Sequence, residues 1–316
     1  MNVLVVGGAG YIGGGVVDVL IGKNIPFTVY DNLLYEYQYL KPVDFIRGDV
    51  RDTEKLKKIL PDYTHVIWLA AIVGDAACQV KPDLTLEVNQ ASVKWVAQNY
   101  NGRIIFPSTC SVYGQNDQMI DEGSSVNPLS IYAKAKLGAE KYLHEGNHLI
   151  LRLGTVYGVS DGSSRLRMDL VVNYMTASAL TKGKLVVFGG TQWRPLIHVK
   201  DVAEAMVDNL AKETMGIYNL STVNLQIKDL AKIVSDMTGC LVEYTPQKFE
   251  DLRNYHVANE KVVRDGVFRL EGSRDIAYGV REVAGLIRSG RVKYTDNDVY
   301  FNERHVASLY ESGEFV

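Results

Sequence analysis

The chain begins with MNVLVVGGAGYIGGGVVDVLIGK at residues 1–23, and this stretch decides the fold. The apolar run at 2–6 predicts a buried strand, and the pattern at 16–23 predicts a helix. Between them lies GGAGYIG (7–13), with glycines at every third position. Such glycines allow a tight turn and a close approach of a pyrophosphate, and the helix N-terminus offers free N–H groups to it. The stretch therefore predicts the phosphate-binding turn of a dinucleotide site.

The alternation of strand and helix continues through the first half of the chain. Further strands are predicted at 27–31, 45–49, 65–70, 103–108 and 149–154. Helices are predicted at 16–23, 53–60, 86–100 and 131–144. Near-continuous apolar strands separated by helices are typical of a parallel sheet covered on both faces. We therefore expect an α/β fold with a doubly wound parallel sheet of the Rossmann type.

The alternation weakens after about residue 160. A polar stretch, DGSSRLRMD (161–169), is followed by amphipathic helices and isolated strands. We predict a Rossmann domain at 1–160 with returns near 196–222. Residues 161–195 and 223–316 are predicted to form a smaller, interleaved C-terminal lobe that binds the substrate.

Composition narrows the possible partners. Hydrophobic residues make up 47% and charged residues 22% of the 316 residues, and the net charge is −3. No bulk basic field favours nucleic acid or an anionic membrane. The apolar stretch at 66–74 is too short to span a bilayer, and a strand at the start leaves no room for a signal peptide. We expect a cytoplasmic protein whose three separated cysteines are reduced and whose histidines, lacking ligand spacing, bind no metal.

Asp31 ends the predicted second strand, 18 residues after Gly13. A carboxylate there can accept both hydroxyls of the adenosine ribose and repels a 2′-phosphate. No Lys or Arg follows before Lys41, so the sequence favours NAD over NADP. The competing interpretation is an Asp that only caps a turn. The residues expected to bind the cofactor are Gly7, Gly10, Tyr11, Ile12, Gly13, Asp31, Asn32, Asp49, Val50, Leu69, Ala70 and Ala71. Gly14 and Gly15 extend the glycine run and should each weaken the helix by roughly 1 kcal/mol relative to alanine.

Tyr132 and Lys136 form a Y-x-x-x-K pair on one face of a predicted helix. A phenol is normally a poor base at neutral pH, but a nearby cation favours the phenolate. A catalytic role for this pair is supported by FPSTCSVYG (106–114), which lies at the end of the fifth strand, at the sheet edge where ligands bind. Thr109 in this segment could hydrogen-bond a substrate oxygen as its proton leaves for Tyr132.

These motifs, taken in order, resemble the extended short-chain dehydrogenase/reductase superfamily, and within it the NAD-dependent nucleotide-sugar epimerases and dehydratases related to UDP-galactose 4-epimerase. The resemblance covers nearly the whole chain and includes GGAGYIG, VYDNL, GDVRD, WLAA, PSTCSVYG, YAKAK, LRLGTVYG and RPLIHVKDVAEA. It implies Thr109, Tyr132 and Lys136 as the catalytic set, with Tyr132 and Lys136 also contacting NAD. It further implies a nucleotide-diphosphate sugar as substrate and a homodimer paired through helices 86–100 and 131–144.

The substrate side departs from the family pattern. Thr155 stands where the family usually has Asn, and Pro195 replaces an acid. Arg194 and Arg253 remain as candidates for the diphosphate, and the competing interpretation is that they are surface salt-bridge partners. The expected substrate-binding residues are Ser108, Thr155, Arg194 and Arg253, with Arg165 and Arg167 as weaker candidates.

The family's first step is oxidation of a sugar hydroxyl, with Tyr132 as base. Family dehydratases carry an acidic pair directly after the catalytic Thr, where this chain has Cys110 and Ser111. We interpret Cys110 as a packing residue. The sequence therefore favours 4-epimerisation or simple C4 oxidation over dehydration. The alternatives are an amino-acid dehydrogenase of the threonine type, which needs no diphosphate arginines, and a catalytically silent NAD-binding regulatory protein.

Overall fold

The computed structural model describes residues 1–245 and 254–313, and within them the chain builds a seven-stranded central sheet. Its order is β11-β7-β5-β4-β1-β2-β3, and every neighbouring pair is parallel. The strands are β1 (Val3–Val6), β2 (Phe27–Asp31), β3 (Phe45–Arg47), β4 (His65–Trp68), β5 (Arg103–Thr109), β7 (His148–Leu153) and β11 (Gly216–Leu220). The strand order reverses direction at β1, which confirms the predicted doubly wound fold and creates a ligand-binding edge there.

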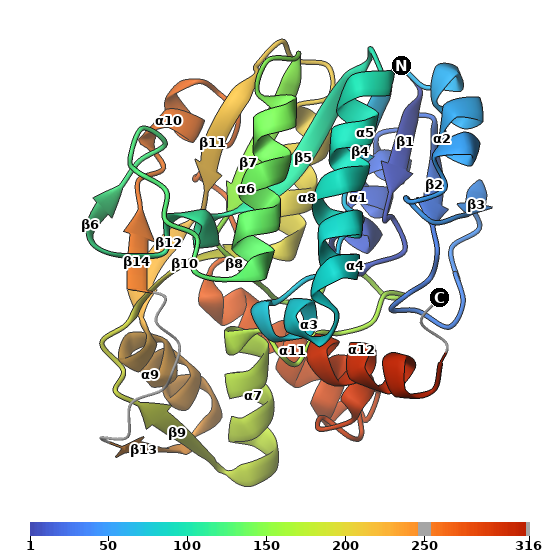
Figure 1. Ribbon diagram of the computed structural model, residues 1–316. Coiled ribbons are helices and arrows are strands. Elements are labelled where there is room, and N and C mark those ends of the chain that lie inside the picture. The colour runs from blue at the N-terminus through green and yellow to red at the C-terminus, as the bar shows by residue number, and fades with distance from the viewer. Residues whose placement is uncertain (246–253, 314–316) are drawn as a thin grey trace.

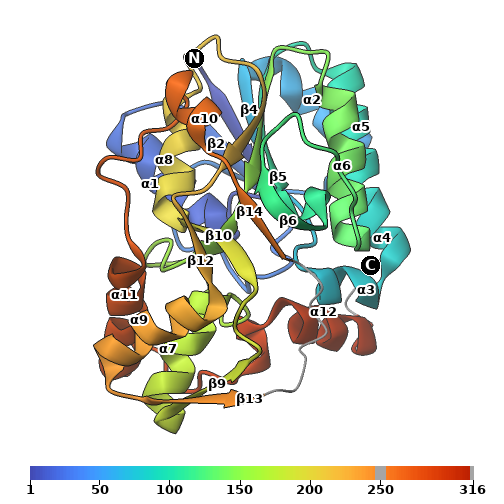
Figure 2. The ribbon, with the colours of Figure 1, turned by 90° about the vertical axis from the view of Figure 1, so that its left-hand side faces the viewer.

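Helices cover both faces of this sheet (Figures 1 and 2). On one face lie α1 (Tyr11–Gly22) and α8 (Val199–Asp208). On the other lie α2 (Thr53–Ile59), α5 (Ser92–Asn99) and α6 (Ile131–Leu143). Val3 and Val5 pack into the core of the first face, and Leu4 and Val6 into the core of the second. Because both sides of β1 are buried, its sequence is an uninterrupted apolar run.

The predicted helix at 86–100 is interrupted in the structure. It consists of α4 (Pro82–Leu86), a π-helical turn at Glu87–Ala91, and α5. Within the π turn, buried Asn89 pairs with the backbone of Ile72: its Nδ2 donates to the carbonyl and its Oδ1 accepts from the N–H, both at 2.8 Å. Through Asn89, the π turn thus anchors the loop after β4. Single π turns within α-helices are frequent at functional sites.

A second group of elements lies beneath the carboxyl edge of the sheet (Figures 1 and 2). It contains α7 (Val171–Lys182), α9 (Ile227–Thr238) and α11 (Ile276–Arg288), with β9 (Lys184–Phe188) paired to β13 (Leu241–Thr245). Smaller ladders join β8 (Thr155–Tyr157), β10 (Trp193–His198) and β12 (Val223–Gln226), and pair β6 (Gln115–Ile120) with β14 (Asn254–Val257). The remaining helices are α3 (Asp75–Val80), α10 (Glu260–Arg264) and α12 (Asn302–Glu311). Among the described residues, no helix has the length and apolar character needed to cross a bilayer.

The structure explains Gly14 and Gly15, which the sequence left without a role. A Cβ on Gly14 would lie 2.1 Å from the Ser164 hydroxyl and 2.6 Å from the Asp161 carboxylate. The N–H of Gly15 donates to the Ser160 hydroxyl at 2.8 Å. Lys41 fixes this contact, because its ammonium pairs with Asp161 at 2.5 Å and donates to the Gly14 carbonyl at 2.6 Å. The glycines therefore let the segment 160–164 pack directly on the first turn of α1.

This contact predicts opposite effects of alanine at two positions of one helix. Gly14→Ala should lower the free energy of unfolding by roughly 1–2 kcal/mol, because overpacking outweighs the gain in helix propensity. Gly22→Ala, the matched control, should raise it by up to ~1 kcal/mol, since no atom lies within 4 Å of the added Cβ. Urea denaturation measures both. Equal stabilisation by the two substitutions would contradict the packing assigned to Gly14.

Candidate active site

The carboxyl ends of the central strands open into one cleft of about 1750 Å³. It extends from the glycine turn to the elements beneath the sheet. The sequence-predicted residues that line it are Gly7, Gly10, Tyr11, Ile12, Gly13, Asp31, Asn32, Asp49, Val50, Leu69, Ala70, Ala71, Ser108, Thr109, Tyr132, Lys136, Thr155, Arg165, Arg167 and Arg194. Arg253 lies outside the described residues.

The glycine turn has the geometry of an anion-binding site. Gly7 has φ +82°, and a Cβ there would lie 2.4 Å from the Ala70 nitrogen; a Cβ on Gly13 would lie 2.5 Å from the Gly8 carbonyl oxygen. These two glycines serve the packing of the turn itself. Gly10 differs, because its Cβ would meet only the Gly7 oxygen, at 3.5 Å. Its missing side chain keeps the cleft open in front of the N-terminus of α1, which no side chain caps. The turn therefore fits a pyrophosphate.

Asp31 is held at the end of β2 by two backbone N–H groups. Its carboxylate accepts from Ala9 at 3.0 Å and from Leu33 at 2.7 Å. Burial raises the pKa of Asp31, and these hydrogen bonds oppose that shift. Leu33 adopts a left-handed conformation, with φ 63°, in making its contact. The carboxylate is thus oriented by the main chain and faces the cleft, where ribose hydroxyls would bind.

Asp49 lies at the next strand end and is engaged by Arg51, a residue that the sequence analysis did not single out. Arg51 donates to the Asp49 carboxylate at 3.0 and 2.9 Å, and Asn32 adds a contact of 3.3 Å. Burial works to raise the pKa of Asp49, but the hydrogen bonds from Arg51 bring it below its usual value. The positive charge of Arg51, which borders the end of the cleft expected to hold the adenosine, is therefore neutralised by Asp49.

The three predicted catalytic residues converge on the opposite end of the cleft. Thr109 ends β5, and its hydroxyl oxygen accepts from the Ser111 N–H at 3.1 Å, which leaves the hydroxyl proton able to donate. Tyr132 lies in the first turn of α6, whose N-terminus is capped by Ser130. Lys136, one turn later, is buried and donates from Nζ to the Pro107 carbonyl at 2.9 Å. A hydroxyl donor, a phenol and an ammonium thus face one space.

The ionisation of this set differs from the sequence-based expectation. Burial raises the pKa of Tyr132, and the charge of Asp75 adds to the rise. The opposing positive charge is that of Arg167, although the sequence had assigned that part to Lys136. Burial lowers the pKa of Lys136 to about 8. Within the protein's own groups the phenol is therefore kept protonated, and a bound cation such as the nicotinamide ring would shift it toward the phenolate.

A buried polar network lies behind Thr109 and Lys136. Arg152 on β7 pairs with Glu140 on α6 at 2.7 Å and donates to the Tyr113 hydroxyl at 2.9 Å. Ser108, a predicted substrate-binding residue, lines the cleft but donates its hydroxyl to Glu140. The network ties α6 to β5 and β7, and so fixes Tyr132 relative to Thr109. No motif marks this network, because its members come from separate strands and helices.

The substrate side of the cleft separates the arginine candidates. Arg194 on β10 lines the cleft and donates to the Trp193 carbonyl at 2.8 Å. Arg165 binds the Val299 carbonyl and the Asn302 side chain, so its guanidinium is committed to the fold and not to a diphosphate. Arg167 is paired with Asp169 at 2.8 Å. Thr155 on β8 is half-buried and borders the cleft.

Cys110 has the environment of a packing residue. Its side chain is fully buried beside Val112 and Tyr113, and its Sγ lies 3.2 Å from the Arg152 carbonyl. Burial raises the pKa of its thiol well above the usual value. The thiol is therefore protonated and does not border the cleft.

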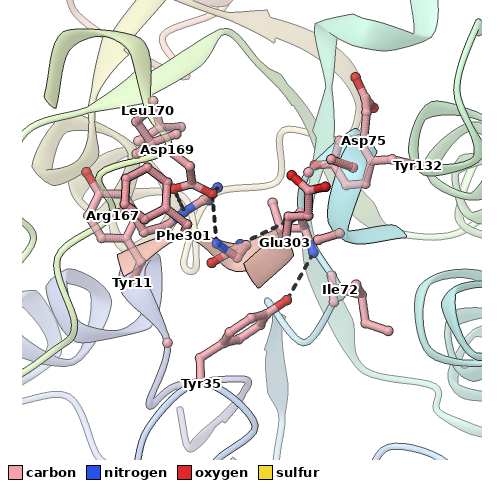
Figure 3. Close-up of a pocket in the computed structure, with 18 of the residues that line it drawn as sticks. Tyr11, Tyr35, Ile72, Asp75, Tyr132, Arg167, Asp169, Leu170, Phe301 and Glu303 are labelled. Atoms are coloured by element: carbon pink, nitrogen blue, oxygen red, sulfur yellow. Dashed lines mark hydrogen bonds and ion pairs between the residues drawn. The ribbon is translucent and has the colours of Figure 1, made fainter. Parts of the chain in front are cut away.

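Other cleft residues come from segments that the sequence analysis did not connect with the site (Figure 3). Asp75 opens α3, directly after the loop that follows β4. Its position in the stretch that follows the predicted fourth strand could have been noticed. Phe301 and Glu303 precede and open α12, near the end of the described chain, and no motif marks them. Tyr255 on β14 shares a contact of 3.2 Å between its hydroxyl and that of Ser111.

Comparisons with known proteins agree with this geometry. A sequence model of the NAD dependent epimerase/dehydratase family matches residues 3–221. The chain is 29% identical over 273 residues to a putative UDP-glucose 4-epimerase of Methanocaldococcus jannaschii, covering 80% of this chain and 88% of that protein. It is 26% identical to UDP-glucuronic acid decarboxylase 2 of Arabidopsis thaliana, covering 79% of this chain and only 60% of that protein. The crystal structure of Thermus thermophilus UDP-glucose 4-epimerase with NAD is similar, with a TM-score of 0.77, 25% identity, and coverage of 91% of this chain and 99% of that one.

The chain belongs to the NAD dependent epimerase/dehydratase family, which confirms the resemblance read from the sequence. It is an enzyme of that family, and its cofactor is NAD, as the sequence predicted.

The carboxylate of Asp31 predicts the choice between the two nicotinamide dinucleotides. NAD should bind at least about tenfold more tightly than NADP, a difference of about 1.4 kcal/mol, because a 2′-phosphate would meet this carboxylate. Isothermal titration calorimetry measures both affinities. Equal or tighter binding of NADP would contradict the assignment of Asp31 to the ribose.

Proposed function

We propose that this protein oxidises the C4 hydroxyl of a nucleotide-diphosphate sugar, as a 4-epimerase or a 4-dehydrogenase. The observation that carries the proposal is the convergence of Thr109, Tyr132 and Lys136 in the cleft that also contains the glycine turn and Asp31. The UDP-sugar enzymes named above support the substrate class.

The chain's own residues would handle the proton of the reaction. Tyr132 accepts the proton of the C4 hydroxyl as general base. The hydroxyl of Thr109 donates a hydrogen bond to the same substrate oxygen. Lys136 holds a positive charge one helical turn from the phenol and is placed to bond the ribose of the cofactor. NAD, when bound, supplies the hydride acceptor, and the 4-keto sugar that results can be reduced again from either face.

The surroundings of Thr109 favour this reaction over dehydration. The next two residues are Cys110 and Ser111, so no carboxyl group follows Thr109 directly. Cys110 is buried away from the cleft, and the Ser111 hydroxyl lies against Tyr255. An amino-acid dehydrogenase or a silent regulatory protein gains no support from the relatives described above.

We further propose a cytoplasmic homodimer. Helices α5 and α6 lie side by side on one outer face, with Tyr142 near the end of α6 38% exposed and Leu86 at the end of α4 42% exposed. Pairing of this face with its copy would give an isologous four-helix contact. Sedimentation at micromolar concentration should give twice the mass of 35.2 kDa, and a single species of chain mass would contradict the dimer.

The proposed reaction is tested with a panel of UDP-, dTDP- and GDP-sugars and the NAD-loaded protein. NADH fluorescence reports oxidation, and product stereochemistry at C4 separates an epimerase from a dehydrogenase. Transient NADH with a C4 epimer as product supports the epimerase, whereas stoichiometric NADH supports the dehydrogenase. A panel in which no sugar is oxidised, or in which water is lost instead, would contradict the proposal.

Three substitutions around Tyr132 should differ in severity. Lys136→Ala should slow oxidation by on the order of 10²-fold, because the cofactor ribose loses the ammonium placed to bind it and the reacting groups lose their alignment. Thr109→Ala should cost about tenfold, since it removes one hydrogen bond to a charged oxygen. Cys110→Ala should leave the rate nearly unchanged, because the thiol is buried behind the cleft. Single-turnover NADH formation between pH 6 and 10 gives this order, and a rate lost only in Cys110→Ala would contradict it.

A further inference from the structure

Arg167 belongs to the polar stretch 161–169 that leads into the second group of elements, and it lines the cleft. Its Nε and Nη2 donate to the Asp169 carboxylate at 2.9 and 2.8 Å, and its side chain is 11% exposed. The third nitrogen, Nη1, makes no hydrogen bond to any residue that the structure describes. A planar guanidinium held along one edge presents its remaining N–H groups in a fixed direction. Nη1 is therefore available to a ligand in the cleft.

The backbone of Arg167 is fixed close to the N-terminus of α1. The Asn173 amide donates to the Arg167 carbonyl at 2.9 Å and to the Gly158 carbonyl at 3.1 Å. The Tyr11 hydroxyl donates to the same Gly158 carbonyl at 2.7 Å, and Tyr11 is the first residue of α1, directly after Gly10. Figure 3 shows Arg167 on the same side of the cleft as Tyr11. The guanidinium therefore borders the turn that fits a pyrophosphate.

The charge of Arg167 acts on three tyrosines in different parts of the cofactor site. Burial raises the pKa of Tyr11 and of Tyr132, and in both cases the charge of Arg167 opposes the rise. Burial also raises the pKa of Tyr35 to about 12, against a backbone hydrogen bond and the charge of Arg167. Tyr35 follows the loop of Asp31, Tyr11 follows the glycine turn, and Tyr132 marks the catalytic end. Because Coulomb interactions weaken with distance, a charge that acts on all three lies between them, where the pyrophosphate joins the two halves of the cofactor.

Pairing with Asp169 does not exhaust the positive charge on this side of the cleft. Burial works to raise the pKa of Asp169, but Arg167, the Asn302 N–H at 3.2 Å and the charge of Arg165 bring it below its usual value. One carboxylate thus interacts with two guanidinium groups. Glu36 accepts a hydrogen bond from the Arg165 N–H at 2.8 Å, and burial raises its pKa to about 7. Glu36 is therefore only partly ionised at neutral pH.

We infer that Arg167 is a cofactor-binding residue whose Nη1 donates a charge-assisted hydrogen bond to the pyrophosphate of NAD, from the wall opposite the glycine turn. The N-terminus of α1 offers roughly half a positive charge, which is less than the charge of two phosphates. A guanidinium supplies further charge in a geometry that suits phosphate oxygens. Lys41, which lies beside the glycine turn, is committed to Asp161 at 2.5 Å and to Asp18 at 2.6 Å. The sequence suggested Arg167 only as a weaker candidate for the substrate diphosphate.

The inference is tested with two variants that differ only at residue 167. Asp169→Asn keeps the guanidinium, whereas the double variant Arg167→Gln with Asp169→Asn removes both charges and leaves neither one buried without its partner. Calorimetry should show that the double variant binds NAD and ADP-ribose, which share the pyrophosphate, at least about tenfold more weakly than Asp169→Asn does. The affinity of the NAD-saturated protein for UDP should be the same in both variants.

Arg264→Gln is the matched control, because it removes one positive charge from an exposed ion pair with Asp265, on α10 and outside the cleft. It should leave the affinities for NAD, ADP-ribose and UDP as they are. A loss of NAD affinity in Arg264→Gln as large as that in the double variant would overturn the inference, because the effect would then be one of net charge.

Equal affinity of Asp169→Asn and the double variant for NAD would also overturn the inference, since Arg167 would then serve the fold alone. A loss for UDP as large as that for NAD, or a loss confined to UDP, would assign Arg167 to the substrate diphosphate instead. A loss for NAD that ADP-ribose does not share would place the contact on the nicotinamide half. If urea denaturation shows the double variant to be unfolded, Arg167→Lys decides: it keeps the charge opposite Asp169 but lacks the planar fork. It should bind NAD and ADP-ribose several-fold more weakly than the wild type, and unchanged affinity would overturn the inference.

Discussion

The rest of the structure depends on the close approach of the glycine turn to the ends of β1 and β4. Gly7 passes so near the Ala70 backbone that a single methyl group would collide with it. This approach brings the N-terminus of α1 to the point where the strand order reverses, which is where ligands bind in open sheets of this kind. The segment 160–164 packs on Gly14 and Gly15, so the same stretch also anchors the loop that leads into the second group of elements. The cofactor edge and the substrate side are thus positioned from one short segment.

The chemistry of the cleft rests on a second constraint, the rigid placement of α6 against the sheet. Tyr132 and Lys136 lie on one turn of this helix, and the buried Arg152–Glu140 pair locks it to β5 and β7. Breaking one partner of such a pair is costly, because it leaves an uncompensated buried charge. The same burial that fixes the helix raises the pKa of Tyr132 and lowers that of Lys136. Tyr132, the proposed base, is therefore kept protonated by the protein's own groups, and the positive charge of a bound cofactor would favour its phenolate.

Local sequence patterns were sufficient to predict the sheet, the glycine turn and most of the residues that line the cleft. Each of these features depends on a short segment within or directly after a strand. The helix at 86–100 was predicted as continuous, since its π turn depends on a contact between Asn89 and Ile72 that spacing does not reveal. Arg165 was considered for a diphosphate, but its partners lie more than 130 residues away. The Arg152–Glu140 network went unnoticed because its members come from separate strands and helices, and Glu303 because no motif marks it. Contacts between distant segments, and the ionisation that they impose, required the structure.

The central claim is that Tyr132 removes the proton during oxidation of the sugar. The most direct measurement is single-turnover NADH formation by Tyr132→Phe with the best nucleotide-sugar substrate. The substitution removes one oxygen from a helix that the buried network holds in place, so fold and NAD affinity should be unchanged. The account predicts that the rate falls by roughly 10²–10⁴. Retention of most of the wild-type rate would contradict it.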